Sequence, residues 1–75
     1  MEELKLFIQE EIANIAFKKV NFDDALITSK LLDSITVVEL LVAIEEKIGK
    51  QIPQYLINDD NFNSINKIIE TVKKV

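Results

Sequence analysis

Apolar residues recur at steps of three and four along several parts of this chain, the spacing that places them on one side of a helix. In residues 2–20 the stripe consists of Leu4, Phe7, Ile8, Ile12, Ile15 and Ala16. Two glutamates begin this stretch, and Lys18 and Lys19 end it, which matches the polarity of a helix dipole. We therefore predict a first helix from Glu2 to about Val20.

The pattern changes between residues 21 and 33. Asn, Asp, Thr and Ser surround the large apolar residues Phe22, Leu26, Ile27 and Leu31, a composition typical of a loop that is pinned by buried side chains. The segment is long for a connection between two helices, and such loops are often functional or bridge elements that lie far apart.

A second helix is predicted from Ser34 to Ile48. Gly49, the only glycine of the chain, follows at the position of a left-handed C-cap, and Pro53 then blocks an early restart. At about 100° per residue, one arc of this helix has the width of a core-facing stripe. That arc carries Val37, Leu40, Leu41, Ile44 and Ile48.

The last part of the chain predicts a short turn and a closing helix. Residues 54–62 suit one helical turn near Leu56 to Asp60. Helical spacing then returns at Ile65, Ile68, Ile69, Val72 and Val75, after Asn63 and Ser64, which are both good N-caps. We expect one all-α domain over residues 1–75: a small bundle of three main helices plus one short helix, with a long loop between the first two.

Composition places the chain in the ordinary soluble globular class, with 48% hydrophobic and 29% charged residues. The longest uninterrupted apolar run, Leu40 to Ile44, is far shorter than the roughly 20 residues of a membrane span. The acidic start Met1-Glu2-Glu3 has the wrong sign for a secretory signal. We expect a cytoplasmic monomer without a membrane span.

The residues that are absent limit the chemistry of the chain itself. Without Cys, His or Trp it cannot form a disulfide, a thiolate nucleophile, an imidazole base or an ordinary zinc site. A net charge of −4 disfavours nucleic acid and favours partners with basic patches. One glycine and one proline leave no material for a glycine-rich phosphate loop. A demanding reaction would need a borrowed group.

The predicted second helix also has an apolar outer side. Ile35, Val38, Val42 and Ala43 alternate there with Glu39 and Glu46, and Glu45 lies at the border. Apolar residues beside acidic ones form a small patch suited to a transient partner with a basic rim. The alternative is that single exposed apolar residues are ordinary, or that the small bundle buries this helix on all sides.

Ser34 begins this helix and has two interpretations. As an N-cap, its hydroxyl would accept a backbone N–H, a role worth about 1 kcal/mol. It cannot be the nucleophile of a triad, because the chain has no histidine. A helix N-terminus favours an anion through its free N–H groups and its dipole, so Ser34 is suited to carry a phosphate ester that another enzyme attaches.

The sequence around Ser34 resembles a known family. L-L-D-S-I at residues 31–35, followed by T-V-V-E-L-L-V-A-I-E-E-K-I and by I-P at residues 52–53, is similar to the attachment region of acyl carrier proteins and peptidyl carrier domains. The resemblance implies an acyl-carrier-like bundle. It also implies that a magnesium-dependent phosphopantetheinyl transferase attaches 4′-phosphopantetheine from coenzyme A to Ser34. Cargo would then be a thioester on the terminal thiol, and the chain would not be an enzyme.

The same resemblance implies roles for the neighbouring residues. Asp33 would help to present the serine, and Ile35 and Val38 would flank it. Val42 would be the central apolar anchor for partners. Acidic contacts would come from Glu39, Glu45 and Glu46. The implied partners are the transferase, an acyl- or aminoacyl-activating ligase, and a downstream synthase or transferase.

Some residues depart from the fatty-acid branch of the family. That branch usually has D-S-L with an acidic residue next, whereas Thr36 follows Ile35 here, Lys47 interrupts the acidic run, and Leu31 replaces a glycine. With D-N-F-N-S-I-N-K-I-I at residues 60–69, the chain resembles stand-alone carriers of aminoacyl or specialised acyl groups, including D-alanyl carrier proteins. The cargo, whether fatty acyl, polyketide, amino acid or D-alanine, stays open. A long acyl chain would need a cavity among Val37, Leu41, Ile44, Ile65 and Ile69.

Two other functions are compatible with the sequence. The chain could be an interaction module that never takes the cofactor and uses only the outer side of its second helix. It could also be an enzyme that uses paired carboxylates, Asp23 with Asp24 or Asp59 with Asp60, as acid and base. Adjacent acids in loops are usually solvated turn residues.

Overall fold

In the computed structural model, which describes residues 2–75, the chain folds into helices joined by irregular segments, and none of these residues lies in a strand. The elements are α1 (Glu2–Ala16), α2 (Ser34–Ile48), the 3-10 turn η1 (Gln54–Leu56), α3 (Asp59–Phe62) and α4 (Ile65–Val72). This confirms the predicted all-α bundle with a long loop between its first two helices. No helix within residues 2–75 has both the length and the apolar character needed to cross a bilayer.

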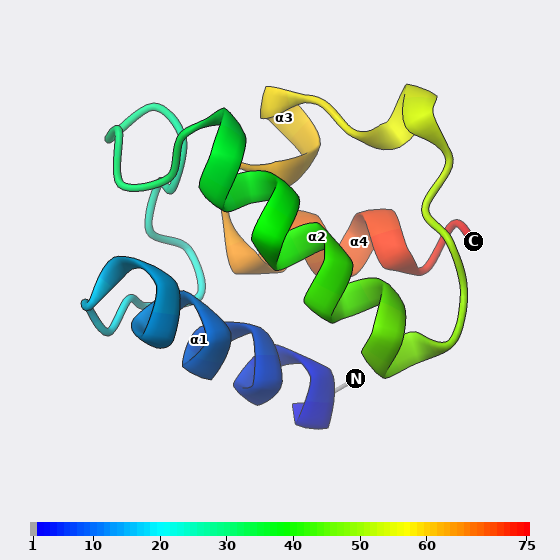
Figure 1. The fold of residues 1–75 in the computed structure, drawn as a ribbon, viewed down its shortest axis with the longest axis horizontal. Helices are drawn as coiled ribbons and strands as arrows, with labels where there is room; N and C mark the ends of the chain where they lie inside the picture. Colours follow the sequence, from blue (N-terminus) through cyan, green and yellow to red (C-terminus); the bar gives the residue numbers. More distant parts are fainter. Residues whose placement is uncertain (1) are drawn as a thin grey trace.

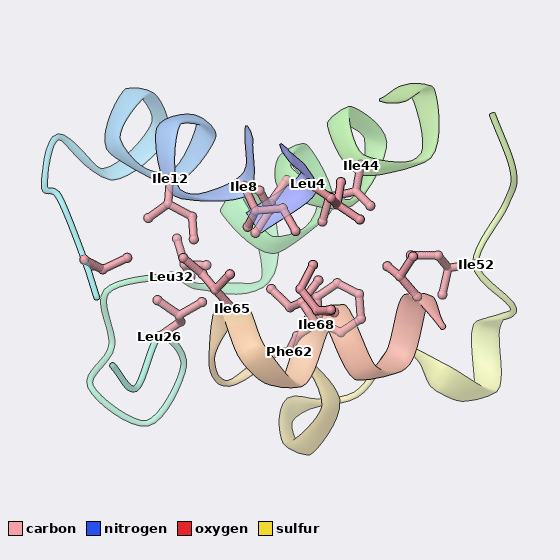
Figure 2. Packing of buried hydrophobic residues seen from close by; sticks show 14 of the residues in the cluster. Leu4, Ile8, Ile12, Leu26, Leu32, Ile44, Ile52, Phe62, Ile65 and Ile68 are labelled. Carbon is pink, nitrogen blue, oxygen red and sulfur yellow. The ribbon is translucent and has the colours of Figure 1, made fainter. Parts of the chain in front are cut away.

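The helices pack in two layers around one core. Figure 1 shows α1 and α2 side by side and running in opposite directions, with α4 crossing them and α3 close to the beginning of α2. The core lies between α1 and α2 on one side and α4 on the other (Figure 2). Its fully buried members include Ile8, Ile12, Leu40, Ile44, Ile65 and Ile68.

The predicted stripe of α2 faces this core. Leu40 and Ile44 are completely buried, and Val37, Leu41 and Ile48 are partly buried against the same cluster. The bounds of α2 are those predicted, and Gly49 is the left-handed C-cap, with φ 71°. A residue with a side chain would be strained at that φ, which explains why the helix ends at the only glycine.

The end of α1 was predicted too late. The helix stops at Ala16, Phe17 takes a left-handed conformation with φ 58°, and Lys18 and Lys19 lie outside the helix. Val20 is 2% exposed, and the Gln9 side chain donates to its carbonyl oxygen (Nε2···O 2.7 Å). The chain therefore leaves the helix so that Val20 can enter the core.

The long loop is attached to the junction between α3 and α4. Asn63 Oδ1 accepts the N–H groups of Ile27 (2.8 Å) and Thr28 (3.0 Å), and the Asn63 carbonyl accepts the N–H of Leu26 (2.8 Å). Leu26 and Leu32 are buried, as expected of a loop pinned by apolar side chains. These contacts fix the segment that leads into α2.

The segment between α2 and α4 contains two short helical pieces where one turn was predicted. They are η1 and α3, and Asn58 separates them as the N-cap of α3, accepting the N–H of Asn61 (Oδ1···N 2.8 Å). Of the two candidate caps for the last helix, Ser64 is the one used, and its Oγ accepts the N–H of Lys67 (3.1 Å).

Candidate functional site

Ser34 is the first residue of α2 and is exposed. The hydrogen bonds at this helix start join Asp33, Ile35 and Thr36, and none of them uses the Ser34 hydroxyl. The hydroxyl is therefore open to solvent at the tip of a helix.

The N-cap of α2 is Asp33, which corrects the alternative that Ser34 fills this role. Asp33 Oδ1 accepts the N–H groups of Ile35 and Thr36, both at 2.9 Å. In return, Thr36 Oγ1 accepts the N–H of Asp33 at 2.8 Å. This reciprocal capping box satisfies helix-end donors that would otherwise be unpaired, and it leaves Ser34 without a structural task.

The capping box determines the electrostatics at this end of α2. The backbone N–H of Thr36, then its hydroxyl, and more weakly the N–H of Ile35 lower the pKa of Asp33, because each stabilises the charged carboxylate. The N–H groups of Ile35 and Thr36 are thus already bound to an anion. The expectation that free N–H groups there would receive a phosphate is wrong for these two residues; the helix dipole still favours an anion nearby.

A cleft of about 390 Å³ adjoins Ser34. It lies between the start of α2 and the segment that enters α3, and its lining contains both apolar and polar residues. The lining residues are Ile27, Leu32, Asp33, Ser34, Val37, Val38, Ile57, Asn58 and Asp59. Three larger clefts do not include Ser34: one at the start of α1 and the ends of α2 and α4, one beside α4, and one between α2 and the segment around Pro53.

The outer face of α2 continues from Ser34 along the helix. We use this term for Ile35, Val38, Glu39, Val42 and Glu46. The apolar members are 69%, 55% and 49% exposed for Ile35, Val38 and Val42, and both glutamates are exposed. The alternative that the bundle buries α2 on all sides is therefore wrong.

No model of a known protein family matches the chain, but curated proteins do. The D-alanyl carrier protein of Leuconostoc citreum is 36% identical over 75 residues, which cover all of this chain and 88% of the relative. The D-alanyl carrier protein of Lactobacillus delbrueckii subsp. bulgaricus is 32% identical over 74 residues, covering 91% of this chain and 92% of the relative. This chain belongs to the D-alanyl carrier protein family. A third member, from Leuconostoc mesenteroides subsp. mesenteroides, is 33% identical over 75 residues.

Membership of this family confirms the resemblance to carrier proteins and to their D-alanyl branch, and it gives the chain the role of a carrier. Ser34, Asp33 and the outer face lie together at and beyond the start of α2.

Glu45 differs from the other expected docking residues of this chain. It is partly buried, and its Oε2 accepts the N–H of Ile52 at 2.7 Å. Ile52 itself is 4% exposed, so this contact ties the chain after Gly49 back onto α2. The carboxylate of Glu45 is engaged inside the protein, a role that the sequence did not suggest.

Lys47, which interrupts the acidic run in the sequence, does not interrupt the outer face. Its Nζ lies 5.3 Å from the centre of the Phe7 ring on α1, a cation–π contact on the side where α1 and α2 pack. The positive charge of Lys47 is therefore directed toward α1 and does not separate Glu39 from Glu46 on the outer face.

The core of this carrier is closed around the positions that a long acyl chain would need. Ile44, Ile65 and Ile69 are between 0% and 3% exposed, and the cleft beside Ser34 is lined by none of them. Val37 is the one residue of the expected cavity that reaches this cleft.

The paired aspartates take part in local structure. Asp24 Oδ2 accepts the N–H of Asn21 at 2.8 Å, and Asp23 accepts from the side chain of Asn66. Asp59 and Asp60 are exposed in the first turn of α3, where acids suit the helix dipole. Within residues 2–75, no group of three or more acidic side chains is placed to hold a metal ion.

Proposed function

We propose that this protein carries an aminoacyl group, D-alanine according to the names of its relatives, on a 4′-phosphopantetheine arm attached to Ser34. The observation that supports this best is the Ser34 hydroxyl, which is exposed and unbonded at the start of α2 within the D-S-I sequence. When bound, the arm supplies the thiol that the chain lacks, and the cargo is held on it as a thioester.

The residues around Ser34 fit such a group. No hydrogen bond of the capping box uses the hydroxyl, and the adjoining cleft of about 390 Å³ offers apolar and polar lining residues to a flexible arm. The core favours a small cargo, because Ile44 and Ile65 are fully buried and neither lines the cleft beside Ser34.

In the attachment reaction, Ser34 Oγ is the nucleophile. A bond forms between Oγ and the phosphorus that bears the pantetheine. The P–O bond within the coenzyme A pyrophosphate breaks, and adenosine 3′,5′-bisphosphate leaves with the electron pair. The hydroxyl proton goes to a base on the transferase, because this chain has no histidine. Asp33 is a weak base, since its pKa is lowered and Oδ1 already accepts two N–H groups.

The outer face of α2 is the surface we assign to the partners: the transferase, an aminoacyl-activating ligase and the enzyme that receives the cargo. Exposed Ile35, Val38 and Val42 can enter apolar pockets, and exposed Glu39 and Glu46 attract a basic rim. A partner bound there lies beside Ser34.

The test is coexpression with a broad-specificity phosphopantetheinyl transferase, followed by the intact mass. The wild type should gain the mass of one arm and Ser34→Ala should gain none. Ser29→Ala is the matched control: Ser29 lies on the preceding loop and its Oγ is bonded to the Ala25 carbonyl at 2.6 Å, so this variant should still be modified. A wild type without the adduct, or Ser34→Ala with it, would reject the proposal.

The exposed outer face also supports a second candidate function, that of an interaction module without a cofactor. Under that function, Ser34→Ala would support growth and partner binding as well as the wild type does, while Val42→Asp would abolish both. Under the carrier function, each variant alone causes the loss.

A further inference from the structure

No hydrogen bond at the start of α2 holds the Ser34 side chain in one orientation. The hydrogen bonds at the start of α2 bypass its hydroxyl, so no side-chain contact of that network orients it. The direction in which the hydroxyl points therefore follows from how firmly the residues on either side are held.

Thr36 lies within hydrogen-bond distance of three atoms of Asp33, the residue before Ser34. Thr36 Oγ1 accepts the N–H of Asp33 at 2.8 Å. The single hydroxyl proton of Thr36 can go to Asp33 Oδ1 at 3.1 Å or to the Asp33 carbonyl oxygen at 3.2 Å. The Thr36 N–H also donates to Oδ1, at 2.9 Å. Without its hydroxyl, Thr36 would keep only this last bond to Asp33.

We propose that Thr36 is a positioning residue for the attachment reaction: by holding Asp33, its hydroxyl fixes the direction in which the Ser34 hydroxyl meets the transferase. This inference rests on the proposed attachment at Ser34. Thr36 is partly buried and is not a member of the outer face, so its effect reaches the reaction through Asp33 and the Ser34 backbone.

The expected consequence is a loss of rate rather than of binding. A misplacement of about 1 Å can cost a reaction up to about 100-fold, and the flexible start of a helix should lose less than that. We expect Thr36→Val, which replaces the hydroxyl by a methyl group, to lower the kcat of modification by about 10-fold. The KM for the carrier should stay within about twofold, because the outer face keeps its residues.

The experiment measures initial rates of modification by intact mass, with purified transferase and coenzyme A, over a range of carrier concentrations. Thr36→Ser keeps the hydroxyl and should retain the wild-type kcat. Ser64→Ala is the matched stability control: it removes the N-cap of α4, the acceptor of the Lys67 N–H, far along the chain from Ser34. It should lower the melting temperature and leave kcat unchanged.

The outcomes separate the inference about Thr36 from the proposed function. An unchanged kcat in Thr36→Val overturns the inference, and so does an equal loss of kcat in Ser64→Ala, or a rise in KM without a change in kcat. A wild type that takes no arm rejects the proposed function instead.

A measurement on the unmodified wild type covers the case in which Thr36→Val does not fold. The Asp33 amide hydrogen is bonded to Thr36 Oγ1, so it should exchange with solvent more slowly than the same amide in an unstructured peptide. Exchange at the unprotected rate would show that the hydroxyl does not hold Asp33, and the inference would fail.

Discussion

Replacing Glu45 by alanine should destabilise this protein although Glu45 belongs to the acidic run that the family resemblance assigns to docking. The change removes the acceptor of the Ile52 N–H, which lies 2.7 Å from Oε2. Ile52 is 4% exposed, so water reaches its backbone poorly. Hydrogen bonds to charged groups contribute about 1.5–3 kcal/mol, and the partial burial of Glu45 places the expected loss at about 2 kcal/mol.

Urea unfolding followed by the helical circular dichroism signal measures this loss. A small domain has an m-value of about 1 kcal/mol per molar urea, so the midpoint for Glu45→Ala should fall by roughly 2 M. Glu45→Gln keeps a side-chain oxygen that can accept the N–H and should lose about half as much. The m-value should stay unchanged, since the same surface is exposed on unfolding.

Glu46→Ala is the matched control. Glu46 is the next residue, is exposed and lies on the outer face, so its removal should change stability by less than about 0.5 kcal/mol. If the two alanine variants unfold at the same urea concentration, the contact between Glu45 and Ile52 does not stabilise the protein, and the reasoning is refuted.

Three further predictions follow from the cap, the outer face and the end of α1. Val42 is 49% exposed, so Val42→Asp should raise the transferase KM by about 10-fold or more, equivalent to about 1.4 kcal/mol of lost binding. The melting temperature should not change. An unchanged KM would contradict docking at Val42. Folding lowers the pKa of the Asp33 carboxyl from 3.8. The charged carboxylate therefore stabilises the folded protein fully above that pH, and this stabilisation is lost as the pH falls through the lower pKa of the folded protein. Asp33→Asn, which can still cap but does not titrate, should lose this component of the acid transition, and identical acid transitions would disprove its origin in Asp33. Phe17 has φ 58° and is 91% exposed. Phe17→Gly should relieve backbone strain by more than the extra backbone entropy that glycine loses on folding, and raise the melting temperature by about 2–5 °C. A lower melting temperature would show that Phe17 is not strained.

The sequence predicted those parts of the fold that local signals determine. The end of α2 follows from Gly49, since only glycine takes a left-handed conformation without strain. The end of α1 does not follow from local signals, because Val20 continues the apolar spacing. It is the burial of Val20 and its contact with Gln9, eleven residues earlier, that end the helix.

The same distinction applies to the site. Ser34 and the outer face could be found from the sequence because a helix of known phase places Ile35, Val38 and Val42 on one side. The choice of Asp33 over Ser34 as N-cap was missed, although the threonine three residues after Asp33 was an available signal for a capping box. The bond from Glu45 to Ile52 had no such signal, because it spans the turn at Gly49.

Glu3, near the beginning of the chain, and Val75 lie at one pole of the molecule. Glu3 and Val75 line the same cleft as Ile48, the last residue of α2, and Figure 1 shows this pole away from the start of the helix. The 15 residues of α2 separate it from Ser34 by about 21 Å. A fluorophore, an affinity tag or a bead linked to either end would therefore stand clear of the serine and of much of the outer face, so a carrier immobilised in this way could be loaded and unloaded repeatedly by enzymes passed over it.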